Sequence, residues 1–190
     1  MKKVDALILI GKPGAGKGTQ SGILKQKLRM EAIPYGEFFR GIANQEGFLS
    51  QKVGSLMDNG EFLPYWIPSY VLVDYMINAS NPNQGIILDG AGRSREEAIV
   101  VHKVLTWFER EYSVVYIDVP DDIAISRLSE RLDLLHREDD KPEHIQKRLD
   151  THNELVVPAI EYFKEKGKLI TVNGNQSMEL VSADILKALQ

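Results

Sequence analysis

The chain has 190 residues, of which 43% are hydrophobic and 26% charged, with a formal net charge of −4 and no cysteine. This composition is ordinary for one globular domain with a well-buried core. The negative charge disfavours nucleic-acid binding, and the lack of cysteine excludes disulfides and cysteine-ligated zinc. Neither a signal peptide nor an apolar run of membrane-spanning length is evident, so we expect a cytoplasmic protein.

The apolar run at residues 6–10 predicts a buried strand, and a glycine-rich loop follows it at residues 11–20 (GKPGAGKGTQ). The loop fits the pattern G-x-x-x-x-G-K, in which backbone amides surround phosphate oxygens that side chains would obstruct. Lys17 adds a mobile positive charge, and the helix predicted at residues 17–28 adds the positive end of its dipole. The spacing predicts a nucleoside triphosphate site; the alternative is a strand-to-helix turn that is glycine-rich by chance.

One departure from the usual loop concerns the metal. Most such loops follow the lysine with a hydroxyl residue that holds Mg²⁺, whereas this chain has Gly18 and places Thr19 one position later. A second apolar run, at residues 85–88, ends in Asp89, and a carboxylate at that end of a strand can anchor the metal. We therefore expect Asp89 to orient waters on Mg²⁺; the alternative is that Asp89 caps the following turn.

The remaining pattern alternates strands with helices. Further apolar runs predict strands at 114–119 and 169–172, and the short run at 31–35 is a candidate fifth strand. Helical patterns lie at 95–109, 121–133 and 142–166, which favours an α/β fold with a parallel sheet covered on both faces. Residues 36–79 show little strand character and several amphipathic stretches, so we interpret them as a helical insertion.

Arginines are the third informative feature. Arg127 and Arg131 are four residues apart and share one helical face, while Arg137 and Arg148 lie on either side of the next predicted turn. Arg93 follows the Asp89 strand in a loop. Phosphoryl transfer needs positive charge around the migrating group, and arginine binds phosphate in a bidentate manner. Taken singly, each arginine is more simply a solvated residue or an ion-pair partner.

Four segments, GKPGAGKGTQ, GIILDGAGRS, DVPDDIAISRLSER and HREDDKPEHIQKRLDTHNELVVPAIEYF, have the order and spacing seen in adenylate kinases and related nucleoside monophosphate kinases. The chain resembles this family over nearly its whole length. The resemblance implies a P-loop three-layer α/β/α fold with a five-stranded parallel sheet, formed by residues 1–35, 80–131 and 138–190. It also implies a monophosphate-binding insertion at about 36–79 and a short lid at about 132–137.

The resemblance assigns expected roles to matching positions. Lys17, Arg93, Arg131, Arg137 and Arg148 would be catalytic. ATP would be bound by Pro13, Gly14, Ala15, Gly16, Lys17, Gly18, Thr19, Arg127 and Arg131. The nucleoside monophosphate would be bound by Tyr35, Arg40, Leu63, Gly90, Arg93, Glu97, Arg137 and Arg148. Asp89 would hold Mg²⁺ through water, and Asp139 and Asp140 match acids at the hinge of the lid that pair with arginines.

The chain departs from the family pattern around the acceptor. It has Pro34-Tyr35-Gly36-Glu37 where the family usually has Ser-Thr-Gly-Asp, and Gly90-Ala91-Gly92-Arg93-Ser94 where the family usually has Gly-Phe-Pro-Arg-Thr. Glu97 stands in place of the glutamine that reads adenine. An ionised glutamate only accepts hydrogen bonds, which opposes adenine N1 by about 1–3 kcal/mol and suits the two adjacent donors of guanine.

Glu97 therefore predicts an acceptor base that is guanine-type or relaxed rather than strictly adenine. The alternatives are that Glu97 points into solvent or that the register is shifted by one residue. Tyr35 is expected either to stack on the acceptor base or to belong to the core.

The sequence thus predicts a monomeric kinase that moves the γ-phosphoryl group of ATP, as its Mg²⁺ complex, to a nucleoside monophosphate. We expect it to engage neither nucleic acid nor a membrane. The rival interpretations are a P-loop kinase of another small metabolite, which would not need Arg40 and Arg93, and a degenerate nucleotide-binding protein without catalysis.

Overall fold

The fold is built on one parallel sheet. The computed structural model describes the chain except for residues 1–3, 79–80, 82 and 137. Five strands pair in the order β2-β3-β1-β4-β5, all parallel. Their bounds are β1 (Ala6–Gly11), β2 (Glu31–Pro34), β3 (Ile86–Asp89), β4 (Tyr112–Asp118) and β5 (Leu169–Asn173). The predicted α/β fold is confirmed, including the short second strand.

Strand β1 lies at the centre of the sheet and sends alternate side chains into two separate cores. Ala6, Ile8 and Ile10 pack into one core, and Leu7 and Leu9 pack into the other. All five are at most 2% exposed. Because both faces of a central parallel strand are covered, its sequence is a continuous apolar run rather than an alternating one.

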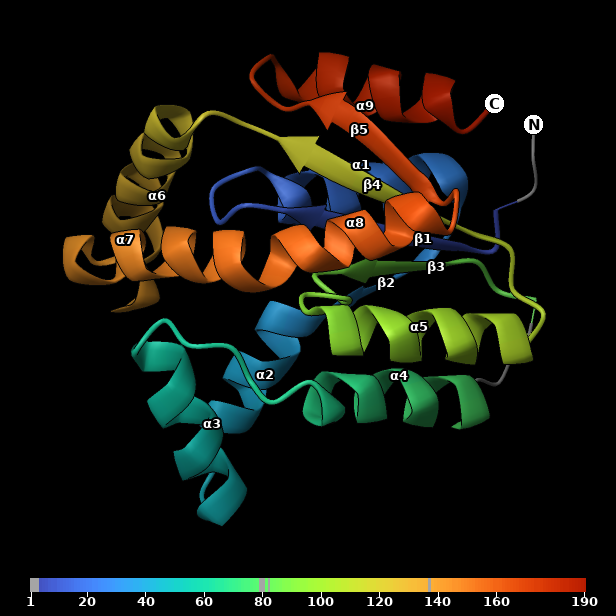
Figure 1. Cartoon of the computed structure of the whole chain (residues 1–190). Helices are drawn as coiled ribbons and strands as arrows, with labels where there is room; N and C mark the ends of the chain where they lie inside the picture. Colours follow the sequence, from blue (N-terminus) through green and yellow to red (C-terminus); the bar gives the residue numbers. More distant parts are fainter. Residues whose placement is uncertain (1–3, 79–80, 82, 137) are drawn as a thin grey trace.

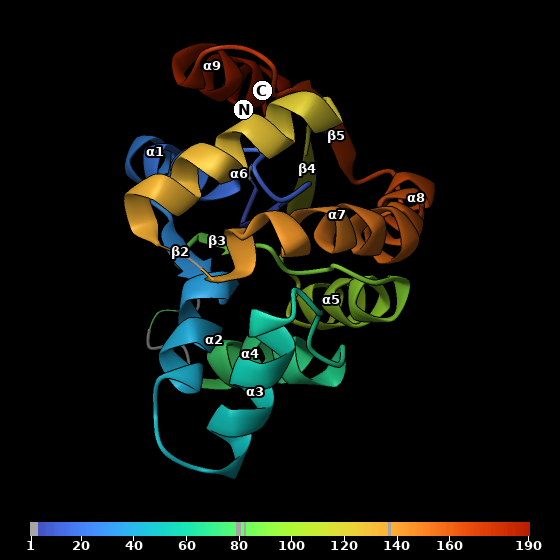
Figure 2. The ribbon, with the colours of Figure 1, turned by 90° about the vertical axis from the view of Figure 1, so that its left-hand side faces the viewer.

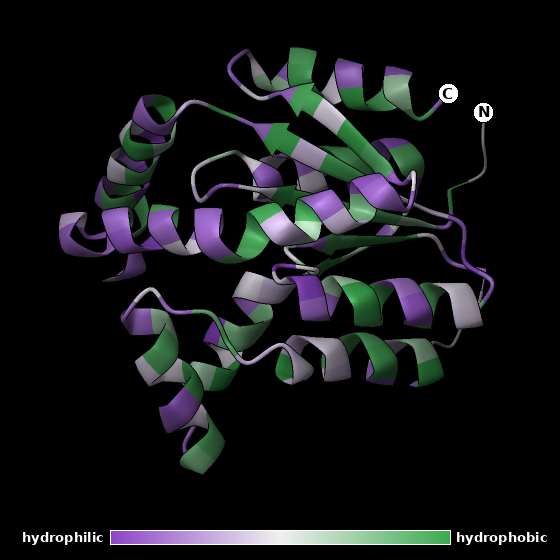
Figure 3. Cartoon of the chain, viewed as in Figure 1, coloured by the Kyte–Doolittle hydropathy of each residue, from purple (hydrophilic) through white to green (hydrophobic). Residues whose placement is uncertain are grey.

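In the described part of the chain, helices cover both faces of the sheet (Figure 1). The helices α1, α6, α7 and α9 contribute to the core of Leu7 and Leu9, whereas α5 and α8 contribute to the core of Ile8. In Figure 3 the strands are largely hydrophobic, while the covering helices alternate hydrophobic and hydrophilic residues. The bounds are α1 (Lys17–Leu28), α5 (Arg95–Trp107), α6 (Asp121–Leu135), α7 (Pro142–Thr151), α8 (Val157–Glu165) and α9 (Met178–Ala188).

Three further helices occupy the segment between β2 and β3: α2 (Tyr35–Ala43), α3 (Phe48–Asp58) and α4 (Trp66–Asn78). Helix α4 packs against α5, and α2 packs against α3 (Figure 1). Figure 2 shows α3 below α7, and α3 also contacts η1 (Glu138–Asp140), the short turn that follows α6. The insertion thus faces the segment that carries the arginines.

The sheet places one crevice at the carboxyl ends of its strands. The chain winds from β1 outward to β2 and β3 on one side, then returns to place β4 and β5 on the other side. In open parallel sheets, ligands bind where the direction of winding reverses. The glycine-rich loop after β1 and Asp89 at the end of β3 both lie at this point.

One π-helical turn, η2 (His152–Val156), joins α7 to α8 within the helical run predicted at residues 142–166. His152 is 1% exposed, and its ring stacks on Tyr116 with centroids 6.3 Å apart. Its Nε2 atom has no hydrogen-bond partner in the described part of the chain. Single π-helical turns are rare and often occur near functional sites.

Burial lowers the pKa of His152 to about 4, with the charges of Lys17 and Lys12 acting in the same direction. A free imidazole titrates near 6.5, so the unfolded chain binds a proton between about pH 6.5 and 4 that the folded chain does not. Stability is therefore lost as the pH falls through this window. We expect the free energy of unfolding to drop by about 2 kcal/mol more between pH 6.5 and 4.5 than it does in His152→Phe.

Urea unfolding at the two pH values measures this difference. His136→Asn, at an exposed position, is the control for the removal of a histidine. The same loss of stability in wild type and His152→Phe would contradict the assignment.

Candidate active site

The glycine-rich loop leaves the carboxyl end of β1 and enters α1. Gly14 has a φ of 81°, and a Cβ atom there would lie 2.5 Å from the carbonyl oxygen of Ala124. The loop is also tied to the turn between β4 and α6, since the Lys12 ammonium donates to the Val119 carbonyl at 3.0 Å and to Asp121 at 2.6 Å. These constraints hold the loop as a fixed turn that only glycine permits at position 14.

Lys17 lies at the start of α1, inside this turn. Its Nζ atom donates to the carbonyl oxygens of Gly11 at 2.7 Å and Lys12 at 2.9 Å. Burial and, next, the charge of Arg93 together lower the pKa of Lys17 to about 7, while Asp89 opposes the shift. The lysine is therefore held in a region of surplus positive charge, which an anion would relieve.

Asp89 ends β3 beside this loop. Its Oδ2 atom lies 3.6 Å from the point where a Cβ of Gly18 would stand. Burial raises the pKa of Asp89, while Lys17 and Arg93 act to lower it. In the described part of the chain no group of three or more His, Asp or Glu side chains could hold a metal ion. A single carboxylate suits Mg²⁺ that arrives with nucleotide phosphates and keeps several waters.

Arg93 reaches the same space from the loop between β3 and α5. Its guanidinium lies over the ring of Phe62, 5.4 Å from the centroid, and it packs against Gly90 so closely that a side chain there would collide. Arg40, on α2, places its Nη2 atom 3.3 Å from the point where a Cβ of Gly36 would stand. Both arginines line the same cavity, which they reach from different elements, as a monophosphate site requires.

Two further arginines converge on a buried acid. Asp140 is 0% exposed and accepts hydrogen bonds from Arg131 Nε and Nη2 at 2.5 Å each and from Arg148 Nη1 at 2.6 Å. Arg148 also forms an ion pair with Asp139 at 3.1 Å. Burial acts to raise the pKa of Asp140, but both arginines outweigh it and lower the pKa. The predicted pairing of the hinge acids with arginines is thus present.

Arg127, one turn before Arg131 on α6, donates to the carbonyl oxygen of Gly174 at 3.1 Å. This contact lies just after β5, where the chain turns toward α9. Arg127 thus borders the side of the crevice away from the insertion.

Glu97 is 3% exposed, so it does not point into solvent. Its two carboxylate oxygens accept hydrogen bonds from the backbone amides of Gly92 at 2.8 Å and Arg93 at 2.9 Å. Burial raises the pKa of Glu97, while these amides and the Arg93 charge act against the shift.

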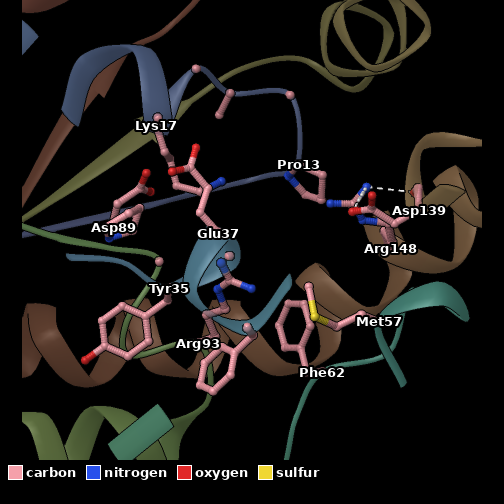
Figure 4. Close-up of a pocket in the computed structure, with 18 of the residues that line it drawn as sticks. Pro13, Lys17, Tyr35, Glu37, Met57, Phe62, Asp89, Arg93, Asp139 and Arg148 are labelled. Carbon is pink, nitrogen blue, oxygen red and sulfur yellow. Dashed lines mark hydrogen bonds and ion pairs between the residues drawn. The ribbon is translucent and has the colours of Figure 1, made fainter. Parts of the chain in front are cut away.

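Tyr35 is 2% exposed and belongs to a hydrophobic core, and its hydroxyl finds no partner among the described residues. Figure 4 shows this hydroxyl pointing away from Arg93 and Phe62.

Most of these side chains line a cavity of about 1120 Å³. Figure 4 shows Lys17, Asp89, Arg93 and Arg148 around it. Arg137 lies outside the described residues. The other predicted positions all line the cavity: Pro13, Gly14, Ala15, Gly16, Lys17, Gly18, Thr19, Tyr35, Arg40, Leu63, Asp89, Gly90, Arg93, Glu97, Arg127, Arg131 and Arg148.

The sequence did not single out three residues of the insertion that shape this cavity. Phe62 supports the Arg93 guanidinium, and Met57 lies beside it (Figure 4). Gly60 lets the chain pass close to Arg148, because a Cβ at Gly60 would lie 3.0 Å from the Arg148 Cγ. The aromatic directly after Gly60-Glu61 was the available signal, but its partner Arg93 is distant in sequence.

Comparison with known proteins agrees with this geometry. A sequence model of the family described as adenylate kinase matches residues 9–168. An adenylate kinase of Leptospira biflexa is 36% identical over 184 residues, covering 96% of this chain and 98% of the relative. One from a Cyanothece species is 34% identical, covering 94% and 92%, and one from Listeria monocytogenes is 30% identical, covering 96% and 98%.

The match runs through the glycine-rich loop, the Asp89 strand and the paired arginines of α6 and α7. The relatives are matched over nearly their full length, so the similarity concerns the whole fold and not an isolated motif. The resemblance predicted from the four sequence segments is confirmed. The chain belongs to the adenylate kinase family and is a phosphotransferase.

Proposed function

We propose that this protein transfers the γ-phosphoryl group of Mg·ATP to AMP and, less selectively than a strict adenine reader, to other nucleoside monophosphates. The observation that carries the proposal is the meeting of Lys17, Arg93, Arg131 and Arg148 around one cavity with Asp89 as the anchor for the metal. Four cations facing one space suit several phosphate groups at once.

The transfer needs no covalent intermediate with the protein. Phosphoryl transfer is catalysed mainly by positioning and by charge stabilisation. The amides of the glycine-rich loop and Lys17 hold the donor phosphates, and Arg127 and Arg131 border the donor side. Arg40 and Arg93 hold the acceptor phosphate, and Arg148 lies between the two sides.

Mg²⁺ is part of the donor substrate and would neutralise the phosphate oxygens that it bridges. Asp89 suits this ion through water, because Gly18 supplies no hydroxyl and the Asp89 carboxylate faces the loop at this position. Burial raises the pKa of this carboxylate, while its neighbours Lys17 and Arg93 act in the opposite direction, toward the ionised form.

The acceptor base is the finer part of the proposal. Each oxygen of Glu97 accepts a hydrogen bond from a backbone amide of its own loop, which favours a role in holding that loop over selecting guanine or repelling adenine. The likeness to proteins named adenylate kinase favours AMP as the best acceptor. Because the Glu97 carboxylate is bound to the amides of its own loop, we expect weak discrimination among the acceptor bases.

Two rival functions are less well supported. A kinase of another small metabolite would have no use for Arg40 and Arg93 beside the same cavity. A non-catalytic nucleotide-binding protein would not need Arg131 and Arg148 to be held by a buried acid. We also propose that the protein works as a monomer in the cytoplasm; its formal net charge of −4 disfavours a nucleic-acid partner.

None of the described helices is long and apolar enough to cross a bilayer. Exclusion of water from the reaction would come from closure of residues 36–79 and of the lid at 132–137 over the nucleotides. The side chains of Leu134 and Leu135 in this lid are largely exposed and border the cavity.

The test is a panel of acceptors. The protein is incubated with Mg·ATP and each of AMP, GMP, CMP, UMP and dTMP, and ADP is measured. We expect turnover with AMP and measurable turnover with other monophosphates. Binding of ATP without turnover on any monophosphate would overturn the proposed function, and a strong preference for GMP would overturn the assignment of AMP.

A further inference from the structure

The loop that carries Arg93 is held by a side chain of the following helix. Glu97 is the third residue of α5 and accepts the N–H groups of Gly92 and Arg93 on separate oxygens. Ser94, the N-cap of α5, in turn accepts the N–H of Glu97 at 3.2 Å. In the usual capping box the third residue reaches back to the N-cap amide. Here it reaches further, to the two amides before the N-cap.

This arrangement depends on the residue at position 92. Gly92 has a φ of 71°, and a Cβ there would lie 3.0 Å from the Phe163 ring. The family pattern has proline at this position, which carries no N–H and cannot donate. Glycine therefore supplies both the backbone conformation and the donor that Glu97 accepts. The two departures from the family pattern, at positions 92 and 97, form one hydrogen-bonded unit.

The unit fixes the orientation of Arg93. The Arg93 amide is bound to Glu97, while its guanidinium packs against Gly90 and over the ring of Phe62. Both ends of the residue are thereby constrained, one by the helix α5 and the other by the insertion. A guanidinium that binds a phosphate in a bidentate manner needs such a fixed position.

We infer that Glu97 is a positioning residue for the acceptor site: it locks the loop of residues 90–94 so that Arg93 presents its guanidinium to the acceptor phosphate, and it does not read the acceptor base. This inference rests on the proposed function. It also explains why a glutamate at this position is compatible with AMP as acceptor. The carboxylate is turned toward its own loop and does not select the base.

Glu97→Gln separates positioning from base reading. Glutamine has one oxygen and one NH₂ group, so it accepts from one of the two amides and presents a donor to the other. If Glu97 positions Arg93, kcat/KM falls about tenfold for every monophosphate, and the ratio of AMP to GMP stays within about twofold. The KM for ATP also stays within about twofold, because the donor side is untouched. Glu161→Gln removes the same charge at an exposed position of α8 that does not line the cavity, and it leaves all these constants unchanged.

Two outcomes of the kinetics overturn the inference. If Glu97→Gln shifts the ratio of AMP to GMP by tenfold or more while the better acceptor keeps its kcat/KM, Glu97 reads the base. If Glu97→Gln has wild-type kcat/KM for every monophosphate and a wild-type KM for ATP, the carboxylate does not position Arg93.

Amide hydrogen exchange followed by NMR tests the contact without any variant. We expect the Gly92 and Arg93 amides of the nucleotide-free wild type to exchange at least about 100-fold more slowly than an unstructured peptide, and to exchange faster in Glu97→Gln. Unprotected amides in wild type would overturn the inference even if the variant failed to fold. Absence of turnover by wild type would instead overturn the proposed function and leave this contact to be judged by exchange alone.

Discussion

We expect that replacing Lys17 with methionine lowers kcat by about 10³-fold, while the affinity for ATP falls by much less. Methionine is close to lysine in length and fills the same turn, so the loop keeps its shape. What is lost is the charge of Nζ, which donates to the carbonyls of Gly11 and Lys12 and which we propose to contact the transferring phosphate. Single-turnover formation of ADP measures the chemical step, and fluorescence titration measures ATP binding.

Proton uptake gives a second readout of the same group. The pKa of Lys17 is lowered to about 7 by burial and by Arg93, so the free enzyme carries the neutral amine increasingly above that pH. Bound phosphates favour the ammonium form, and Mg·ATP binding therefore takes up about half a proton at pH 7 and nearly one at about pH 8. Affinity correspondingly weakens as the pH rises through this range.

Calorimetry in buffers of different ionisation enthalpy counts these protons. Lys17→Met abolishes the uptake, and Lys25→Met, at an exposed position later on α1, retains both the uptake and kcat. A wild-type protein that binds Mg·ATP at pH 8 without taking up a proton would contradict the role of Lys17.

The donor side of the site is readable from the sequence because it is local. The loop, its lysine and the helix that follows are contiguous, so their spacing alone predicts where Lys17 and the amides lie. Asp89 is similarly predictable, because the carboxyl ends of neighbouring parallel strands lie at the same edge of the sheet. The fold class follows from the same alternation of apolar runs with amphipathic helices.

The acceptor side depends on contacts between distant residues and on side-chain direction. The sequence places Glu97 beside the acceptor by analogy, but it does not show that the carboxylate turns back to the Gly92 and Arg93 amides. That direction follows from the φ of Gly92 and from the start of α5, both of which require the backbone. The support of Arg93 by Phe62 also joins residues on separate elements, and no pattern in the chain predicts it.

The sequence predicted that Asp139 and Asp140 pair with arginines, but it did not predict that Asp140 is buried. The acid lies in a short turn among charged residues, where a solvated position would be the simpler expectation. In the structure it is fully buried, with one guanidinium donating two hydrogen bonds and the other donating one. Charge-assisted hydrogen bonds of this kind are stronger than exposed ion pairs, so Asp140 has a larger role than its sequence context suggests.

Asp140→Asn tests that role. We expect kcat to fall about 10²-fold, since both arginines lose the carboxylate that orients them and a displacement of about 1 Å is enough for such a loss. The free energy of unfolding falls by about 2 kcal/mol at pH 7, because asparagine accepts at one oxygen and presents its NH₂ group to a guanidinium. Steady-state kinetics and urea unfolding measure the two effects.

The two effects also separate in ways that a general loss of packing would not produce. Asp150→Asn, at an exposed acid of α7 that accepts a hydrogen bond from Gln146 on the same helix, keeps wild-type kcat and stability. If Asp140 acts by orienting the arginines, the loss in Asp140→Asn appears in kcat itself and persists at saturating nucleotide, because the phosphates then meet guanidinium groups in several orientations rather than one. A wild-type kcat with a raised KM would instead show that the phosphates themselves order Arg131 and Arg148, and that the buried acid serves stability alone.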